Sequence, residues 1–380
     1  MKVLHVASFR GNIGDNANHA GFRPWFEGLA GRPVAWTEFE IRDVYRKTRA
    51  FDEAFAAQAN AADLVVVGGG NYFELWVKDS PTGTSISIPE HILGAIRTPI
   101  FFNALGVDDA QGFTSDTLDR FRRFLRSLLT SDQFLVSVRN DGALAALRRH
   151  VGELPLDQVL HLPDGGFFAP YRAAAAAERP QIAVNLAGDM LDQRFPGEKA
   201  HTYQSFLKEM ARALDQLWRA HPSLRIVLFP HIFRDLAVYA DLLTLMPDQL
   251  RRDQVRVAAY DSGQAAAAAA FGEYAASDAV LGMRFHANVV PLGLGVPTLG
   301  LYCYDQVARL YDELEAPRSV IDVRHPGFGD EIVSRLGTLL SRPESQRTMT
   351  DAIRKRVADQ RALAGTALAA WLSRHALAAS

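Results

Sequence analysis

Short apolar runs rich in β-branched residues alternate along the first part of the chain with longer stretches of helical periodicity. The runs expected to form strands are KVLHVASF, PVAWTEFEI, DLVVVGG, PIFFNALGV, FLVSV and QVLHL. Before FLVSV, residues Leu118, Phe121, Leu125 and Leu128 recur at helical spacing and predict an amphipathic helix. This alternation is typical of α/β proteins with parallel sheets.

A second series of such runs follows, and consists of QIAVNLA, RIVLFPH, QVRVAAY, AVLGM, PTLGLY and SVIDV. The proline-bounded, alanine-rich segment 167–181 interrupts the alternation and predicts a domain boundary. We therefore expect two doubly wound, Rossmann-like domains, over residues 1–170 and 178–342, that face each other across a cleft. Apolar residues at helical spacings within 343–380 predict a C-terminal helix that packs across both domains. The alanine run at 265–271 also predicts a helix.

Composition narrows the classes of protein that the chain can represent. Its 380 residues are 48% hydrophobic and carry a net charge of -2, which argues against a protein that coats nucleic acid. The single cysteine, Cys303, excludes an intrachain disulfide framework and suits a reducing compartment. The N-terminal stretch is too short and polar for a signal peptide. Because Pro291 and Pro297 interrupt the longest uncharged region, we expect no transmembrane segment. With the single cysteine, the expected location is cytoplasmic.

The residues after each strand carry the candidate chemistry, because ligands of parallel sheets bind at the carboxyl ends of strands. After the first strand, GNIGDNANHAG supplies Gly11 and Gly14 for a tight turn, and Asn12 and Asp15 at the start of a helix. Helix N-termini favour anions, so this turn is a candidate substrate-binding site. The alternative is a glycine turn in which Asn12 or Asp15 caps the helix.

A second candidate follows the buried run DLVVVGGGNYFE. Gly69 and Gly70 permit close approach of a ligand or another backbone, and Asn71 and Glu74 follow them. Glu74 is a candidate acceptor for the proton of a sugar hydroxyl, with a solvated loop acid as the alternative. The polar segment 78–90 that follows is expected to be a mobile loop bordering an acceptor site.

Arg139 ends the run FLVSVR and forms the third candidate. A guanidinium at this strand end suits a carboxylate or phosphate ligand. The alternative is local pairing with an acid such as Asp141. Asn140 or Asp141 is expected to cap the helix that follows.

The fourth candidate is GMRFHAN, in which Arg284 and His286 follow the run AVLGM. We expect both to continue the strand in extended form, to project to the same side and to fall at the entry of a helix. Histidine exchanges protons near neutral pH, and an adjacent arginine would hold an anion beside it. A satisfied core histidine is the alternative. His231, at the end of RIVLFPH, is expected in the same cleft as a substrate-binding residue.

The motifs GNIGD, DLVVVGGG, SVR, PDGGF, GMRFH and GVPTLGLYCYD, in this order, resemble the polysaccharide pyruvyl transferase family. The resemblance extends to about residue 310 and implies two Rossmann-like halves like those of GT-B glycosyltransferases. It implies catalytic roles for Arg139, Arg284 and His286. The chain departs from the family pattern in NANHAG after GNIGD, and in Gln306 and Val307 where a lysine is common.

The resemblance implies transfer of pyruvate from phosphoenolpyruvate, as a ketal, to a sugar of a cell-surface polysaccharide or its precursor. The donor carries a carboxylate and a phosphate, which Arg139 and Arg284 would bind. We hypothesise that His286 protonates the methylene carbon and that Arg284 neutralises the leaving phosphate. The reverse assignment, with His286 as the base, stays open. No cofactor is expected, and the absence of metal-ligand spacings such as H-E-x-x-H predicts no metal site.

Two other classes of function remain. A glycosyltransferase of the same architecture would use a nucleotide-sugar donor, with Glu273 or Asp305 holding the ribose. A non-catalytic relative would bind a glycan or a partner protein. The sequence does not identify the acceptor, and leaves open whether it is lipid-linked and brings the protein to the inner membrane face. Basic residues within 354–361 would then touch lipid headgroups, with a solvated helix face as the alternative.

Overall fold

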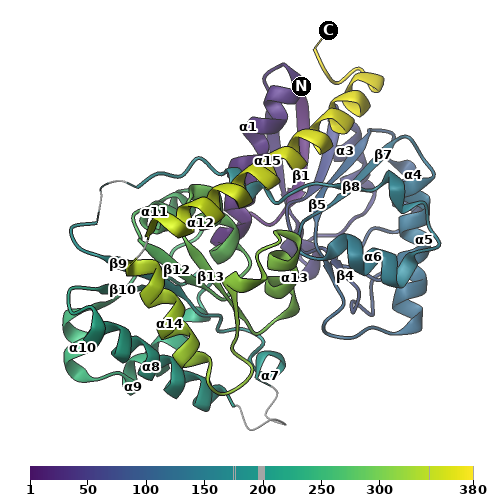
Figure 1. Ribbon diagram of the computed structural model, residues 1–380. Helices are drawn as coiled ribbons and strands as arrows, with labels where there is room; N and C mark the ends of the chain where they lie inside the picture. The colour runs from purple at the N-terminus through teal and green to yellow at the C-terminus, as the bar shows by residue number, and fades with distance from the viewer. Residues whose placement is uncertain (174, 176, 196–201, 342, 380) are drawn as a thin grey trace. The chain divides into compact units, whose positions relative to one another are not determined.

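The structure is a computed structural model that describes residues 1–380 except 174, 176, 196–201, 342 and 380 (Figure 1). The chain forms two compact units. The first contains Met1–Phe9, Gly21–Gly165 and Val357–Ser380, and the second contains Arg10–Ala20 and Gly166–Arg356. Two positions of the expected boundary segment, 174 and 176, lie outside the described residues.

The first unit is built on a parallel six-stranded sheet in the order β2-β1-β3-β5-β7-β8. Its strands are β1 (Lys2–Ala7), β2 (Ala35–Glu40), β3 (Leu64–Gly68), β5 (Ile100–Leu105), β7 (Phe134–Val138) and β8 (Leu160–His161). Two further short strands, β4 (Phe73–Glu74) and β6 (Val107–Asp108), pair with each other in parallel. They continue the chain directly beyond the neighbouring strands β3 and β5.

Helices cover both faces of this sheet because successive strand residues alternate between two apolar clusters. Val65 and Val67 belong to the core with α3, α5 and α6, whereas Leu64 and Val66 belong to the core with α1 and the end of α15. The helices are α1 (Ile13–Ala30), α2 (Ile41–Tyr45), α3 (Glu53–Asn60), α4 (Glu90–Ala95), α5 (Ser115–Leu129), α6 (Ala143–Val151) and α15 (Pro343–Arg374), with 3-10 turns η1 (Leu156–Gln158) and η2 (Gly165–Phe168).

The second unit has its own parallel six-stranded sheet, in the order β11-β10-β9-β12-β13-β14. Its strands are β9 (Gln181–Asn185), β10 (Arg225–Leu228), β11 (Val255–Val257), β12 (Ala279–Gly282), β13 (Thr298–Tyr302) and β14 (Val320–Asp322). The strand order reverses between β9 and β12, which places the topological switch point of this unit there.

Two helical layers enclose this second sheet as well. Ile182 and Val184 pack with α8, α9 and α14, whereas Ala183 packs with α11, α12 and the first turns of α1. Figure 1 shows α8, α9 and α10 together on one side of β9 and β10, with α11 and α12 on the other. The helices are α7 (Leu191–Arg194), α8 (Tyr203–Ala220), α9 (Asp235–Leu245), α10 (Asp248–Asp253), α11 (Gln264–Ala275), α12 (His286–Leu294), α13 (Asp305–Glu313) and α14 (Phe328–Ser341), with the 3-10 turn η3 (Pro317–Ser319).

Every apolar run expected to form a strand does so, and the helices expected around Leu118–Leu128, at 265–271 and in the C-terminal segment are confirmed as α5, α11 and α15. The pair β4 and β6 was not expected, because two-residue strands leave no periodicity to read. In the described part of the chain no helix combines the length and the apolar character needed to cross a membrane.

Candidate functional site

A tight turn joins β12 to α12 and carries Arg284 and His286. The strand ends at Gly282, and His286 is the first residue of α12. The expectation that both residues continue the strand in extended form is wrong, whereas their place at a helix entry is confirmed. The physical reason is Asn288, whose Nδ2 donates to the carbonyl oxygens of Gly282 at 2.9 Å and Arg284 at 2.8 Å and so folds the segment back on itself.

The guanidinium of Arg284 is held by two carboxylates of the second unit. Its Nε donates to Asp235 Oδ2 at 2.9 Å, and its Nη2 donates to Asp189 Oδ1 at 2.8 Å and to Asp235 Oδ1. Burial opposes the charge, but Asp235 and Asp189 raise the pKa of Arg284. Burial would likewise raise the pKa of Asp189, yet Arg284 and Arg194 lower it. Arg284 is therefore a permanently charged group in a fixed orientation.

One edge of this guanidinium remains available. Nη1 of Arg284 makes no hydrogen bond to any residue that the structure describes, and the side chain is 11% exposed. An arginine whose Nε and Nη2 are occupied by carboxylates can still donate two N–H groups from Nη1. The site thus presents a small, preorganised donor edge at the carboxyl end of β12.

Asp235 is the buried anchor of the site, and no sequence motif marks it. It is fully buried and accepts hydrogen bonds from the backbone N–H of Gly188 at 2.9 Å, of His231 at 2.9 Å and of Ile232 at 3.2 Å. These bonds connect the segments after β9 and β10 to Arg284. An aspartate that follows a proline-containing loop carries no local signal of a partner 49 residues away.

The imidazole of His286 lies directly against the backbone of Gly14, in the first turn of α1. A Cβ atom on Gly14 would lie only 2.4 Å from Nδ1 of His286 and 2.7 Å from its Cβ. The N–H of Ile13 donates to the carbonyl of His231 at 3.3 Å and fixes the start of α1 to the second unit. Two helix N-termini, those of α1 and α12, therefore meet at one imidazole, a setting that favours bound anions.

The other residues of the first motif form the turn before α1. Oδ1 of Asn12 accepts the N–H of Gly14 at 3.0 Å, so the alternative in which Asn12 caps the helix is the observed arrangement. Gly11 has φ +87°, a left-handed conformation that favours glycine. Asp15 is buried in the same turn. Their part in substrate binding stays a prediction.

His231 lies behind Arg284 in the core. Its Nε2 shares a hydrogen bond of 2.9 Å with the hydroxyl of Tyr274, and the side chain is fully buried. Burial, with the charges of Arg284 and His286, lowers the pKa of His231 well below its usual range, so the ring is neutral. Its backbone N–H donates to Asp235 and its carbonyl accepts the N–H of Ile13. The role of His231 as a substrate contact stays a prediction.

The first unit carries a separate polar cluster around Glu74. Glu74 in β4 is the register partner of Asp108 in β6, and it accepts a hydrogen bond from the hydroxyl of Ser85. Burial is the largest cause and raises the pKa of Glu74 to about 7, and the charge of Asp108 adds to the rise. The hydrogen bond from Ser85, which is the second-largest effect, and the charges of Arg42 and Arg139 lower the pKa. The alternative that Glu74 is a solvated loop acid is wrong. Sequence reasoning missed Ser85 and Asp108.

Arg139 belongs to this first unit and is 2% exposed. Its Nε pairs with Asp141 Oδ2 at 2.6 Å and its Nη1 lies 3.7 Å from Asp164 Oδ2. The alternative of local pairing is therefore the observed arrangement. Asn140 and Asp141 do not cap α6, because its N-cap is Gly142, with φ +85°, and Oδ1 of Asn140 instead accepts the N–H of Asp164 at 3.1 Å. The catalytic role of Arg139 stays a prediction.

The glycines after β3 let backbone and side chains close up around this cluster. Gly69 donates to the carbonyl of Asn103 at 2.9 Å, and Gly106 donates to that of Gly70 at 3.0 Å. A Cβ on Gly106 would lie 2.3 Å from Oδ1 of Asn71 and 2.7 Å from Nη2 of Arg139. The glycines therefore approach backbone and side chains of the protein itself, and their contact with substrate stays a prediction.

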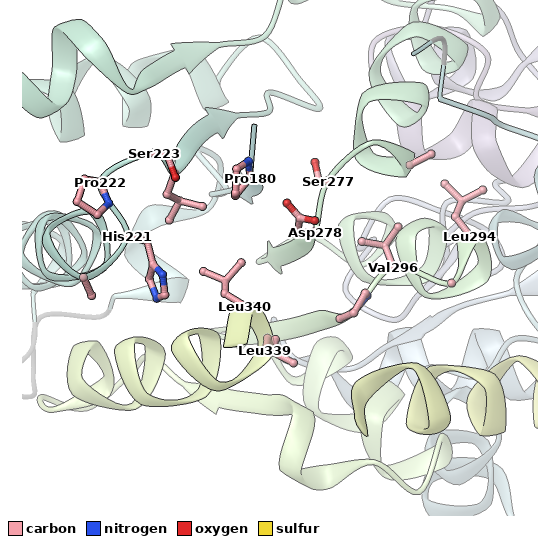
Figure 2. Close-up of a pocket in the computed structure, with 15 residues that line it drawn as sticks. Pro180, His221, Pro222, Ser223, Ser277, Asp278, Leu294, Val296, Leu339 and Leu340 are labelled. Atoms are coloured by element: carbon pink, nitrogen blue, oxygen red, sulfur yellow. The ribbon is translucent and has the colours of Figure 1, made fainter. Parts of the chain in front are cut away.

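The second unit also contains a cavity of about 540 Å³, which Arg284 and His286 do not line (Figure 2). Its walls include Pro180, Asp278 and Pro297, which precede β9, β12 and β13. Figure 2 also shows His221 and Leu340 beside it. It opens at the amino ends of the strands, whereas Arg284 and His286 follow the carboxyl end of β12. Among the described residues, no three histidine, cysteine, aspartate or glutamate side chains gather in a way that could hold a metal ion.

Solved structures show which known fold the chain shares. A protein from Listeria monocytogenes described as a UDP-N-acetylglucosamine 2-epimerase matches with a TM-score of 0.59 at 12% identity, over 92% of this chain and 90% of that one. A glycosyltransferase from Rickettsia africae matches with 0.55 at 8% identity, over 98% of both chains. Anabaena HepE, in complex with UDP and glucose, matches with 0.53 at 12% identity, over 98% of this chain and 100% of that one. The fold is the two-domain, Rossmann-like GT-B type.

Sequence comparison gives the family. No curated protein matches the chain. The family model described as "Polysaccharide pyruvyl transferase" matches residues 2–305, about four-fifths of the chain. This range includes both Gly14 and the Arg284–His286 turn, which meet in the second unit. The chain therefore belongs to the polysaccharide pyruvyl transferase family.

Proposed function

We propose that this protein transfers pyruvate from phosphoenolpyruvate to two hydroxyls of a polysaccharide sugar, or of its precursor, and forms a cyclic ketal. The observation that carries the proposal is the meeting of Gly14, His286 and Arg284 at the switch point of the second sheet. A proton-exchanging imidazole stands at two helix N-termini, beside a guanidinium with one free edge. A small dianionic donor needs this combination of a proton source and fixed positive charge.

The reaction balances without water or a redox partner. The methylene carbon of phosphoenolpyruvate gains one proton and becomes a methyl group, and the central carbon forms two new C–O bonds to the sugar. The C–O bond to phosphate breaks, and phosphate leaves. The two hydroxyls of the sugar release two protons, of which one replaces the proton given to carbon and the other leaves with phosphate. The enzyme therefore needs a general acid, a base and a site for the phosphate.

We assign the acid to His286. A bound phosphate beside the imidazole favours its protonated form, and the N-termini of α1 and α12 favour the anion. Nη1 of Arg284 is the proposed donor to the phosphate, while Asp235 and Asp189 hold the guanidinium in place. Arg139, which is buried and paired with Asp141, is proposed to organise the first unit. The pH dependence of phosphate release by a His286→Gln variant distinguishes this assignment from the reverse one, in which His286 is the base.

A second candidate is glycosyl transfer from a nucleotide sugar, which the fold shared with Anabaena HepE in complex with UDP and glucose favours. In that case Glu273 or Asp305 would hold the ribose. Glu273 pairs with Arg256, and Asp305 accepts the hydroxyl of Tyr302 at 2.8 Å and pairs with Arg309 at 3.3 Å. Either carboxylate would have to exchange these partners for the ribose, which makes pyruvyl transfer the simpler proposal.

A thermal-shift titration separates the two candidates. Wild type and His286→Gln are titrated with phosphoenolpyruvate, UDP-glucose and a GDP-sugar, since a ligand of the native state raises the melting temperature with its saturation. We expect phosphoenolpyruvate alone to stabilise the wild type, and phosphate release in the presence of an acceptor glycan to follow. Stabilisation by a nucleotide sugar only would overturn pyruvyl transfer in favour of glycosyl transfer. Glycan binding without phosphate release from any donor would indicate a non-catalytic relative.

A further inference from the structure

A second arginine, Arg194, lies beside Arg284 in the second unit. Asp189, in the segment after β9, accepts a hydrogen bond from Nη2 of Arg284 at 2.8 Å and from Nη2 of Arg194 at 3.4 Å. Both bonds end on the same atom, Oδ1, so the two Nη2 atoms are separated by no more than the sum of these two distances. Two guanidinium groups therefore share one carboxylate at the carboxyl edge of the second sheet. Arg194 is the last residue of α7, and no sequence motif marks it.

The segments after β9 and β13 hold Arg194 in one orientation. Met190 has φ +54°, a left-handed conformation that is uncommon for a residue other than glycine, and α7 begins directly after it. Nε of Arg194 then donates to the carbonyl of Asp189 at 3.0 Å. After β13, Sγ of Cys303 lies 3.3 Å from Nη1, and the ring centroid of Tyr304 lies 5.5 Å from the guanidinium carbon. The guanidinium is thus fixed before any ligand binds.

Arg194 is a buried cation that the protein pairs incompletely. Its side chain is 7% exposed. Of its five N–H groups, three donate to acceptors in the described part of the chain, namely the carbonyl and Oδ1 of Asp189 and Sγ of Cys303. The bond to the carboxylate is long, and sulfur is a weak acceptor. Because a buried charge is costly unless it is well paired, the two remaining N–H groups indicate an anionic ligand.

We propose that Arg194 binds the carboxylate of phosphoenolpyruvate while Nη1 of Arg284 binds its phosphate. This inference rests on the proposed pyruvyl transfer and gives the second charge of the donor a partner. The carboxylate and the phosphate oxygen are attached to the same carbon, so their partners must be close together, as the shared contact with Asp189 makes the two guanidiniums. The carboxylate keeps its charge throughout the reaction. Arg194 is therefore a residue that selects and orients the donor and takes no part in proton transfer.

Two ligands that differ in the carboxylate alone test this assignment. Phosphoenolpyruvate is compared with isopropenyl phosphate, in which a methyl group replaces the carboxylate, and with inorganic phosphate. Isothermal titration calorimetry gives the Kd of each ligand for the full-length wild type, Arg194→Gln, Arg194→Lys and Arg284→Gln. Arg219→Gln is the matched control, because Arg219 is an exposed arginine of α8 in the same unit and pairs with Asp215. Thermal melts show whether each variant folds.

We expect the wild type to bind phosphoenolpyruvate at least about 10-fold more tightly than isopropenyl phosphate, because hydrogen bonds to a charged group are lost with the carboxylate. Arg194→Gln should raise the Kd of phosphoenolpyruvate by about 10- to 100-fold and leave that of isopropenyl phosphate unchanged. Arg194→Lys keeps the charge without the planar fork of donors and should fall between the two. Arg284→Gln should weaken all three ligands, and Arg219→Gln none.

The possible contradictions separate this inference from the proposed function. A wild type that binds phosphoenolpyruvate and isopropenyl phosphate equally, or a preference that survives in Arg194→Gln, overturns the inference alone. Equal weakening of both ligands in Arg194→Gln also overturns it, because this is the result expected of a merely structural arginine. If Arg194→Gln does not fold, Arg194→Lys decides, and a preference equal to that of the wild type overturns the inference. A wild type that does not bind phosphoenolpyruvate overturns the proposed function as well.

Discussion

The two sheets have the same number of parallel strands but reverse their direction of winding at different places. In the first unit the order β2-β1-β3-β5-β7-β8 reverses between β1 and β3, whereas in the second the order β11-β10-β9-β12-β13-β14 reverses between β9 and β12. Arg284 and His286 follow β12 and so lie at the switch point of their sheet, where doubly wound proteins bind ligands. Arg139 follows β7, away from the corresponding point. Similar strand-end motifs thus occupy different topological positions.

The two arginines make this difference concrete. Arg139 and Arg284 each follow a buried strand and pair with aspartates of their own unit. The side chain of Arg139 is 3% exposed and enclosed by Asp141, Asp164 and Gly106, whereas that of Arg284 is 11% exposed and keeps one edge free. An arginine at a strand end therefore predicts pairing with a carboxylate of the protein. It predicts contact with a ligand only where the fold leaves one edge of the guanidinium open.

The largest expected effect tests the role of His286 in proton transfer. If His286 is the acid, His286→Gln should lower kcat by about 100- to 10,000-fold and abolish the decline of the rate at high pH. A rise of the rate at low pH, which reports the base, should remain. The measurement is the pH profile of phosphate release. A His286→Gln enzyme that loses the low-pH rise and keeps the high-pH decline would assign His286 as the base.

The second-largest effect concerns the buried ion pairs Arg284–Asp235 and Arg139–Asp141. Asp235→Asn should destabilise the second unit by about 3 to 5 kcal/mol, because it leaves the buried guanidinium of Arg284 with only Asp189 and weakens the bonds from the loops after β9 and β10. Asp141→Asn should cost less, because Asp235 accepts three backbone N–H groups in addition to Arg284, and only Asp235→Asn weakens those three bonds. Urea unfolding monitors both.

Asp241→Asn, in the same helix as Asp235, provides the control. Asp241 is exposed and accepts the hydroxyl of Tyr203 at 2.9 Å, so its replacement should change the free energy of unfolding by less than about 1 kcal/mol. Equal losses in Asp235→Asn and Asp241→Asn would show that Asp235 does not anchor the site.

The sequence predicted the strands well because each buried strand is a local apolar run. It did not predict the strand orders, because the neighbours of a strand depend on contacts between distant segments. Arg284, His286 and Gly14 were singled out by their place after strands, which is also local information. The contact between Gly14 and His286 was not predicted, since 271 residues separate the two in the sequence and must fold before they meet.

The unexpected residues share one property. Asp235, Asp108 and Ser85 act on a titratable or charged group that another segment supplies. A lone acid or serine in a loop has no pattern that distinguishes it from a solvated one, and the pair β4 and β6 is too short to show periodicity. The pKa of Glu74 depends on burial and on Asp108, neither of which is encoded near residue 74.

A smaller effect concerns the stability of the first unit. The rise in the pKa of Glu74 from 4.5 to about 7 means that the native state binds its proton more tightly than the unfolded chain. The stability contributed by the protonated form is complete below pH 4.5 and is lost as pH rises through about 7, with a span of at most about 3 kcal/mol. Glu74→Gln should therefore match the wild type near pH 5 and exceed it at pH 8. Urea unfolding at both pH values measures the difference in the free energy of unfolding, and a difference that does not change with pH would contradict the raised pKa.

The smallest effects come from two glycines of one helix. Gly14→Ala should cost about 1 to 3 kcal/mol and lower activity, because its methyl group would displace the imidazole of His286. Gly28→Ala, near the end of α1 that belongs to the first unit, meets no atom within 4 Å and should stabilise the protein by up to about 1 kcal/mol, with activity unchanged. Both substitutions add one methyl group to α1, so helix propensity alone would make them equally favourable. Opposite changes in the free energy of unfolding, with loss of phosphate release only in Gly14→Ala, would establish that the first motif has a glycine here to accommodate His286.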